Sequence, residues 1–334
     1  IRKDELSNEI IETIYFGGGT PSLLAVQEIE AIIKAVNLNY NVIDHPEITL
    51  EANPDDLSQA KILELAESSI NRLSIGVQSF FEEDLKLMNR AHNAKEAKNC
   101  LSLATQYFDN ITVDLIYGIP KMSNERWREN LQILFDFGIN HISSYALTVE
   151  EKTALNSFIK QGKYPPLNEE LAKIHFDMLV EETQKEGFIH YEISNFGKPN
   201  FFSKHNTSYW HQKKYIGIGP SAHSFNQTSR SWNVANNTKY IKSIQENILP
   251  NVVEVLSVND QFNEYIMTGL RTVWGVSLEK IKNDFGDKYQ NFLENQSKKY
   301  IEEDLLYIEN QTLKTTAKGK FLADGLASEL FILS

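Results

Sequence analysis

The stretch Tyr15-Phe-Gly-Gly-Gly-Thr-Pro-Ser22 is the most informative part of this chain. A strand-like run, Ile14–Phe16, opens into three consecutive glycines. Residues without a Cβ let a ligand lie directly against backbone N–H and C=O groups, and packing does not demand three of them in a row. The stretch therefore predicts a ligand-binding loop at the end of a strand.

Residues 12–150 alternate between strand and helix patterns. Runs rich in β-branched residues predict strands at Thr13–Phe16, Glu47–Glu51, Arg72–Val77, Ile111–Ile116 and His141–Leu147. Helical periodicity predicts helices from Ser58 to Ser68, after an Asn93/Glu96 capping box, and from Ser123 to Gly138. This alternation predicts an α/β fold with a helix-covered parallel sheet, doubly wound or barrel-like, whose strands end at one face.

Polar residues recur where these strands end. Glu51 ends the second strand, Gln78 the third, Asp114 lies in the fourth, and Tyr145-Ala146 closes the fifth. Any one of them alone could be a polar residue at the rim of the sheet that hydrogen-bonds to neighbouring loops. A Glu, a Gln and an Asp in apolar runs, together with the glycines, predict a shared site at the strand ends.

Composition limits the class of protein. The chain has 334 residues, 41% of them hydrophobic, which is enough for two domains. A net charge of −12 argues against general nucleic-acid binding. The single cysteine, Cys100, fits a reducing cytoplasm and is expected to be a small buried hydrophobe. No signal-peptide pattern opens the chain, and Ile1 is not an initiator Met, so an N-terminal segment is expected to be missing.

The segment from Ile193 to Gln245 contains no Asp or Glu, although the chain carries 45 acidic residues. It holds seven lysines and arginines and nine aromatic residues. A positive field with flat apolar side chains suits a planar anionic ligand, and it also suits single-stranded nucleic acid. Chance combined with ordinary core aromatics is a nearly equal explanation. Within the segment, His205 in His205-Asn-Thr-Ser-Tyr-Trp210 is a candidate axial iron ligand, although a lone histidine is more often a satisfied loop residue.

Taken together, the motifs resemble the radical S-adenosylmethionine (SAM) family of oxygen-independent coproporphyrinogen III oxidase-like proteins. Besides the glycine loop, the motifs that carry the resemblance come in family order: Glu51-Ala-Asn-Pro54, Arg72-Leu-Ser-Ile-Gly-Val-Gln-Ser-Phe80, Asn89-Arg-Ala-His92, Asp114-Leu-Ile-Tyr-Gly-Ile-Pro120 and Tyr191-Glu-Ile-Ser-Asn-Phe196. The resemblance covers essentially the whole chain and is closest to the family's haem-chaperone branch.

The resemblance implies an incomplete parallel (β/α)6 barrel, here lacking its first βα unit, with a [4Fe–4S] cluster and SAM. By this resemblance the SAM-binding residues are Gly18, Gly19, Thr20, Glu51, Gln78, Arg90, Asp114, Ala146 and His223. Carboxylates and carbonyls suit the ammonium and ribose hydroxyls of SAM, and arginine suits its carboxylate. The three cluster cysteines are expected upstream of Ile1, so the chain has no metal ligands of its own and is expected to be inactive in SAM cleavage. Residues 1–11 would end the first helix of the barrel.

The resemblance leaves two functions open. In the first, a cytoplasmic haem chaperone binds haem through His205, Asn206, Tyr209 and Trp210 and delivers it to respiratory haem proteins. In the second, a coproporphyrinogen III dehydrogenase oxidatively decarboxylates porphyrinogen propionates to vinyl groups. No catalytic residue is assigned, and any membrane contact is expected through a partner. The His-Asn-x-x-Tyr-Trp motif favours the chaperone. A single-strand nucleic-acid binder remains a third hypothesis, weakened by the net charge, and no nucleic-acid partner is expected.

Residues 1–254 are expected to form the barrel domain, with 193–245 as a ligand region, and residues 255–334 a separate unit. Helical patterns at Gln261–Arg271, Ser277–Phe285 and Lys288–Glu303 precede two short strands near residues 306–309 and 312–315 and a final helix from about Lys318. This pattern predicts a small winged-helix-like α+β domain. Acidic residues run through it, so a packing or lid role is favoured over DNA binding.

Overall fold

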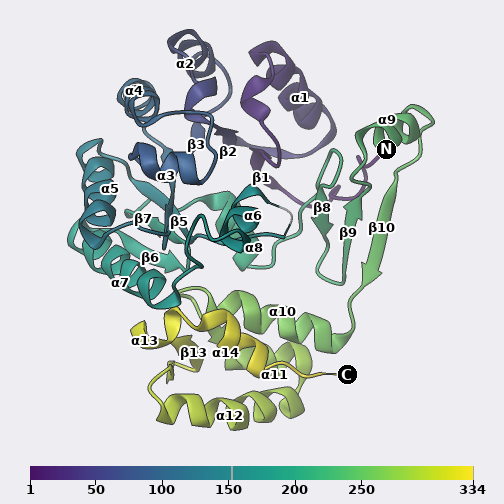
Figure 1. Ribbon diagram of the computed structural model, residues 1–334. Coiled ribbons are helices and arrows are strands. Elements are labelled where there is room, and N and C mark those ends of the chain that lie inside the picture. Colours follow the sequence, from purple (N-terminus) through teal and green to yellow (C-terminus); the bar gives the residue numbers. More distant parts are fainter. Residues whose placement is uncertain (152, 334) are drawn as a thin grey trace. The chain divides into compact units, whose positions relative to one another are not determined.

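The computed structural model describes residues 1–151 and 153–333, which fold as two units (Figure 1). The sheet unit comprises residues 12–36 and 45–203. The C-terminal unit comprises residues 1–11, 37–44 and 204 onward. Among the described residues, no helix combines the length and apolar composition needed to cross a bilayer. The expected domain boundary between residues 254 and 255 stays a prediction.

A seven-stranded sheet forms the core of the sheet unit, in the order β1-β2-β3-β4-β5-β7-β6. Its strands are β1 (Ile11–Phe16), β2 (Val42–Ala52), β3 (Arg72–Gln78), β4 (Ile111–Tyr117), β5 (His141–Ala146), β6 (Ile189–Glu192) and β7 (Asn195–Gly197). Strands β2 to β5 pair in parallel. Leu73, Ile75 and Val113 are fully buried, as expected for a sheet covered on both faces. The strands predicted between residues 12 and 150 are confirmed.

Helices alternate with these strands. They are α1 (Val26–Asn39), α2 (Gln59–Ala66), α3 (Glu82–Leu87), α4 (Ala94–Ala104), α5 (Asn124–Asp136), α6 (Ala154–Lys160) and α7 (Glu169–Lys185). Of these, α1, α2, α4, α5 and α7 are arranged around the outside of the sheet (Figure 1). The capping box predicted at Asn93 and Glu96 is present at the start of α4. Ser123 caps α5, whose Trp127 is fully buried. The result is the expected mixed α/β half-barrel.

The sheet is parallel from β2 to β5 and does not stay parallel to its end. Strands β6 and β7 form an antiparallel hairpin, and β7 pairs antiparallel with β5. Only Ile193 and Ser194 connect the two strands. So short a connection can join antiparallel strands, whereas a parallel pair needs a crossover of a dozen or more residues.

Residues 1–10 form turns, so the prediction that they end a barrel helix is wrong. Arg2 explains the conformation. Its guanidinium binds the carboxylate of Glu5 and donates to the carbonyl of Gly217 (2.9 Å) and the hydroxyl of Ser224 (3.0 Å). These bonds fix the segment to a distant part of the C-terminal unit.

The C-terminal unit contains two three-stranded antiparallel sheets, with strand orders β10-β9-β8 and β11-β13-β12. The first comprises β8 (His223–Phe225), β9 (Ser229–Asn233) and β10 (Asn251–Val255), and α8 (Lys204–Trp210) and α9 (Asn237–Gln245) belong to the same part of the chain. The second comprises β11 (Val276–Ser277), β12 (Leu306–Glu309) and β13 (Thr312–Thr315), with helices α10 (Val258–Leu270), α11 (Leu278–Phe285), α12 (Asp287–Glu302), α13 (Ala317–Lys320) and α14 (Ala323–Glu329). Phe262, Ile266, Leu293 and Leu313 are fully buried in its core. The three predicted helices and two predicted strands are confirmed, whereas the single final helix expected from about Lys318 is divided into α13 and α14.

Gly319 and Gly325, on helices α13 and α14 of the C-terminal unit, differ sharply in how closely other atoms approach them. A Cβ built on Gly319 would lie 2.0 Å from the carbonyl oxygen of Leu305, whereas one built on Gly325 would meet nothing within 4 Å. Gly319→Ala should therefore lower the free energy of unfolding by about 1–3 kcal/mol through overpacking. Gly325→Ala, on the exposed side of α14, should raise it by about 0.5–1 kcal/mol through helix propensity. Urea unfolding measures both; equal effects would contradict the packing at Gly319.

Candidate functional site

The glycine loop and the end of β2 meet at Glu51. The Tyr15 hydroxyl donates to Glu51 Oε1 (2.7 Å), and the Gly18 N–H donates to Oε2 (3.1 Å). A Cβ at Gly17 would lie 2.5 Å from the Tyr15 ring and 2.8 Å from the Glu51 carboxyl group. Gly18 has a φ of 75°, which favours glycine. Packing at Gly17 and backbone conformation at Gly18 therefore account for two of the three glycines.

The outer side of the same loop is open. A Cβ at Gly18 or Gly19 would meet nothing within 4 Å, and the loop is exposed as far as Thr20. Apart from the Gly18 N–H, which Glu51 accepts, the backbone of this loop is exposed, and its role as a cradle stays a prediction. Thr20 leads into a short 3₁₀ turn, Pro21–Leu23, in which its carbonyl accepts the N–H of Leu23 (3.1 Å).

Arg90 connects the ends of β2 and β3. Its Nη2 donates to Asn53 Oδ1 (2.7 Å) and to the carbonyl of Gly76 (3.2 Å). A Cβ on Gly76 would lie 2.9 Å from Gln78 Nε2, 3.4 Å from Arg90 Nη2 and 3.7 Å from Asn53 Oδ1. The side chains of Asn53, Gln78 and Arg90 thus share one space above a glycine.

The Nε of Arg90 is buried and has no hydrogen-bond partner among the described residues. Nearly all buried donors in proteins are paired, so an orphaned guanidinium N–H indicates a missing acceptor. A carboxylate such as that of SAM would provide one. The orphaned Arg90 donor and the open glycine backbone are the two observations that make these residues fit SAM.

Asp114 lies near both charged groups. Burial, with the Glu51 carboxylate as the second cause, raises the pKa of its carboxyl group to about 7, while Arg72, Arg90 and Ser143 oppose the shift. A second carboxylate close to a buried carboxyl group disfavours ionisation of the buried group unless a cation or a hydroxyl joins them. Such a pair suits the ammonium or the ribose hydroxyls of SAM.

A buried polar chain supports the sheet beneath Asp114. Arg72 donates to the hydroxyl of Thr112, which lies 2.9 Å from His141 Nδ1, and His141 Nε2 lies 2.7 Å from the Tyr191 hydroxyl. Burial, with Arg72 as the second cause, lowers the pKa of His141 well below its usual value. A neutral imidazole can bridge the hydroxyls of Thr112 and Tyr191. This series of hydrogen bonds holds the Arg72 guanidinium, and so its positive charge, in place near Asp114.

The predicted SAM residues of the sheet unit therefore come together in part. Gly18, Glu51, Gln78, Arg90 and Asp114 form one connected group of contacts and charges. Ala146 ends β5, opposite Tyr117 of β4. His223 belongs to the C-terminal unit, where it lies opposite Trp232 of β9. Its place in a SAM site stays a prediction.

Sequence reasoning missed Tyr15 and Asn53. Both stood inside motifs that were recognised, next to a glycine loop and a strand end, but neither is charged. Burial, with Glu51 as the second cause, raises the pKa of Tyr15 far above its usual value, so its hydroxyl remains a donor to Glu51. Polar residues flanking a recognised motif were the available signal.

The His205 motif forms helix α8. His205 is half-buried; its Nε2 lies 2.9 Å from the Tyr209 hydroxyl, and the two rings meet edge-to-face with centroids 4.9 Å apart. The Arg271 guanidinium lies over the indole ring of Trp210, with its Cζ 5.2 Å from the ring centroid. The Trp210 Nε1 is buried without a hydrogen-bond partner among the described residues. Motif and helix α10 therefore form one aromatic and cationic cluster.

The positive field expected from the acid-free segment is partly neutralised by acids outside it. Arg230 binds Glu254 (2.5 Å) and Glu264 (2.8 Å), and Lys214 binds Glu9 (2.5 Å). All of these pairs lie within the C-terminal unit. Sequence reasoning missed them because the acids come from segments distant in sequence.

The residues described do not fit an iron–sulfur cluster. Cys100 is buried in α4, and burial raises the pKa of its thiol to about 12, so it is not a thiolate at neutral pH. Across the described ranges, no three His, Cys, Asp or Glu side chains are grouped as metal ligands.

Asp114 gives a pH-dependent test of this site. The folded protein holds a proton that the unfolded chain releases above its usual pKa of 3.8, so stability falls as pH rises from about 4 to about 7 and then levels. Asp114→Asn, which cannot ionise, should raise the free energy of unfolding by on the order of 3 kcal/mol at pH 8 and by less than half of that at pH 5. Urea unfolding at the two pH values measures this. An equal effect at both would contradict the buried carboxyl, and Asp109→Asn, on the exposed surface, is the control.

Comparison with known proteins matches both units. Residues 3–134 match the radical SAM superfamily model, and residues 256–322 match the HemN C-terminal domain model. The heme chaperone HemW of Lactococcus lactis is 34% identical over 328 residues, which cover 97% of this chain and 86% of that protein. HemW of Bacillus subtilis is 30% identical, with 94% and 84% covered.

The solved structure of coproporphyrinogen III oxidase (HemN) from Escherichia coli matches with a TM-score of 0.83 at 20% identity, covering 99% of this chain and 80% of that one. This likeness shows the radical SAM fold. Membership of that superfamily implies SAM and a [4Fe–4S] cluster as cofactors. The identity and coverage of the relatives establish that the chain belongs to the HemW family of radical SAM proteins.

Proposed function

We propose that this protein is a haem chaperone that binds haem through His205 on helix α8, holds SAM at the strand ends of the sheet unit, and passes haem to a respiratory haem protein. The observation that carries the proposal is the His205 motif, folded as a half-exposed aromatic helix, in a chain 34% identical to a heme chaperone. Haem is the cargo in this account.

The chemistry of α8 supports haem binding. An imidazole nitrogen is an ordinary axial ligand for haem iron, and flat aromatic side chains pack well against a porphyrin. Tyr209 is 37% exposed, so its hydroxyl can leave His205 Nε2 without disturbing a packed core. The orphaned Trp210 Nε1 offers a donor for a propionate, and the nearby Arg271 guanidinium, which also binds Asp324, adds a positive charge beside it.

The strand-end residues support SAM binding by this chain. Arg90 has a donor without an acceptor, the backbone of Gly18 and Gly19 is open, and Glu51 and Asp114 offer acceptors. When the family's cluster is bound, it supplies the electron for reductive cleavage of SAM. The residues described here bind and orient SAM.

The dehydrogenase alternative has less support. The solved coproporphyrinogen III oxidase is 20% identical to this chain, a level that speaks only for the fold. The HemW proteins are 30–34% identical over nearly all of it. Formation of vinyl product from coproporphyrinogen III would favour the alternative over the chaperone.

Haem titration tests the proposal. His205→Ala should abolish the Soret shift seen on adding haem to the wild-type chain and weaken binding at least about tenfold, because the axial bond is lost. Tyr209→Phe keeps the ring and removes the hydroxyl that occupies Nε2, so it should bind haem at least as tightly as the wild type.

The matched control is His211→Ala, which removes a histidine packed on Trp274 with ring centroids 4.5 Å apart. This variant should keep the Soret shift. Loss of the shift in His211→Ala but not in His205→Ala would contradict the assignment of the ligand.

A further inference from the structure

Gln78 has an unusual backbone for a residue of a central strand. Its φ is 67°, and the N–H of Ser79 donates to the carbonyl of Val77 (2.9 Å), which closes a three-residue turn around it. This positive-φ γ-turn is the rare and strained form. The pairing of β3 with β4 also shifts register between Ile75 and Gln78. Strained residues persist only where their surroundings impose the conformation.

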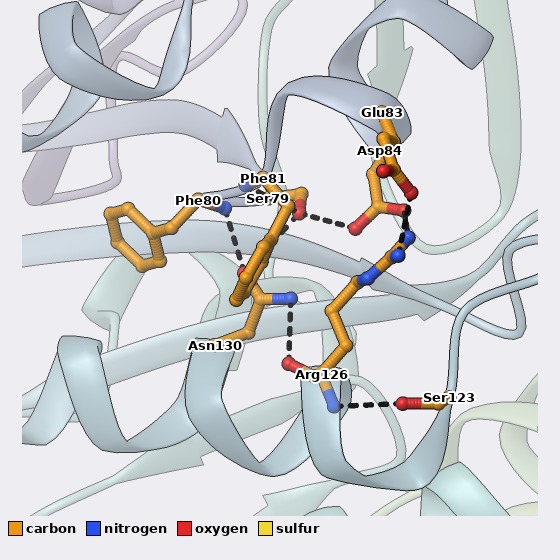
Figure 2. Close-up of polar contacts among 8 residues, drawn as sticks. All are labelled: Ser79, Phe80, Phe81, Glu83, Asp84, Ser123, Arg126 and Asn130. Carbon is orange, nitrogen blue, oxygen red and sulfur yellow. Dashed lines mark hydrogen bonds and ion pairs between the residues drawn. The ribbon is translucent and has the colours of Figure 1, made fainter.

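A largely buried polar network holds the residues that follow this turn (Figure 2). Asn130 Oδ1 accepts the N–H of Phe80 (2.7 Å) and lies 3.3 Å from the Ser79 hydroxyl. That hydroxyl donates to Asp84 Oδ2 (2.8 Å) and accepts the N–H of Phe81 (3.2 Å). The backbone N–H groups of Phe80 and Phe81 are thus held by the side chains of Asn130 on α5 and of Ser79, the residue that follows β3.

Arg126 completes the network. Its guanidinium binds Asp84 (3.0 Å) and Glu83 (2.6 Å), and its carbonyl accepts from Asn130 Nδ2 (3.2 Å). Ser79 and Asn130 are fully buried and Asp84 is 1% exposed. Burial of a carboxylate is costly unless every lone pair has a partner, so this arrangement fixes the position of Asn130.

A second contact acts from another side. The ring of buried His92 lies with Nε2 3.0 Å from the Val77 carbonyl, the same oxygen that accepts the Ser79 N–H. The turn is therefore held at both of its ends. The side chain of Gln78 is directed back over Gly76, and its Nε2 lies on the same side of this glycine as Arg90 Nη2 and Asn53 Oδ1.

We propose that Asn130, with Ser79 and Asp84, is a positioning residue that holds Gln78 in its left-handed turn and so presents the Gln78 amide to SAM. The inference rests on the proposed SAM site. An ordinary packing contact between β3 and α5 would explain the burial of Asn130. A packing contact would not explain why the hydrogen bonds of Asn130 and Ser79 go to the N–H groups of Phe80 and Phe81, directly after the strained turn at Gln78.

A double-mutant cycle on SAM affinity tests the inference, with calorimetry on the 334-residue chain. Gln78→Ala and Asn130→Ala should each weaken SAM binding by about tenfold, and the double variant should be no weaker than Gln78→Ala. Gln132→Ala, on the exposed side of the same helix, is the matched control and should bind SAM normally. Unchanged affinity in Asn130→Ala, or losses that multiply, would overturn the inference.

The same cycle separates the two proposals. If Gln78→Ala binds SAM as the wild type does, or if the chain binds no SAM, the SAM site itself fails and the inference fails with it. If Gln78→Ala loses affinity and Asn130→Ala does not, only the positioning role fails.

Melting temperatures measured without ligand test whether Asn130 holds the turn at Gln78. Gln78→Gly should raise the melting temperature of the wild-type chain, because glycine adopts positive φ without strain. In an Asn130→Ala background the turn can relax, so the same substitution should give no increase. An equal increase in both backgrounds would show that Asn130 does not hold the turn.

Discussion

This structure depends on one constraint: two carboxyl groups, of Glu51 and Asp114, lie close together near the ends of parallel strands, with Arg72 and Arg90 nearby. Parallel strands end at the same edge, so Glu51 on β2 and Asp114 on β4 are brought within electrostatic reach although 63 positions separate their numbers. Burial then makes their mutual repulsion costly, and Arg90 and Arg72 compensate for it only in part. A site with this imbalance is favourable once a ligand with a cation, hydroxyls and a carboxylate enters it.

The other local features follow from keeping that site open and fixed. Glycines stand where a side chain would collide with the Glu51 carboxyl group or the Gln78 amide. Gln78 adopts a strained backbone that the buried network around Asn130 supports. In the C-terminal unit, the rings of His205 and Tyr209 on helix α8 pack against each other, and the Arg271 guanidinium packs on Trp210. Most residues of the proposed SAM site and the residues of the proposed haem site thus belong to different units of the chain.

Strands, helices and most of the strand-end site could be predicted from the sequence, because buried β-branched runs, caps and glycines act over short distances. Glu51, Gln78 and Asp114 were predictable for the same reason: each ends or interrupts an apolar run. The β6–β7 hairpin was not, because a two-residue link between short runs has little periodicity. The turn at Gln78 and the role of Asn130 depend on contacts 50 positions apart, and Arg2 is bound 215 positions away. Such contacts leave no local pattern.

A crystal structure of the chain grown with SAM tests the central claim most directly. We expect SAM to lie over the backbone of Gly18 and Gly19, with its carboxylate on Arg90 and its hydroxyls or ammonium within hydrogen-bond distance of Glu51 and Asp114. SAM bound elsewhere, with the Arg90 Nε still lacking an acceptor, would contradict it.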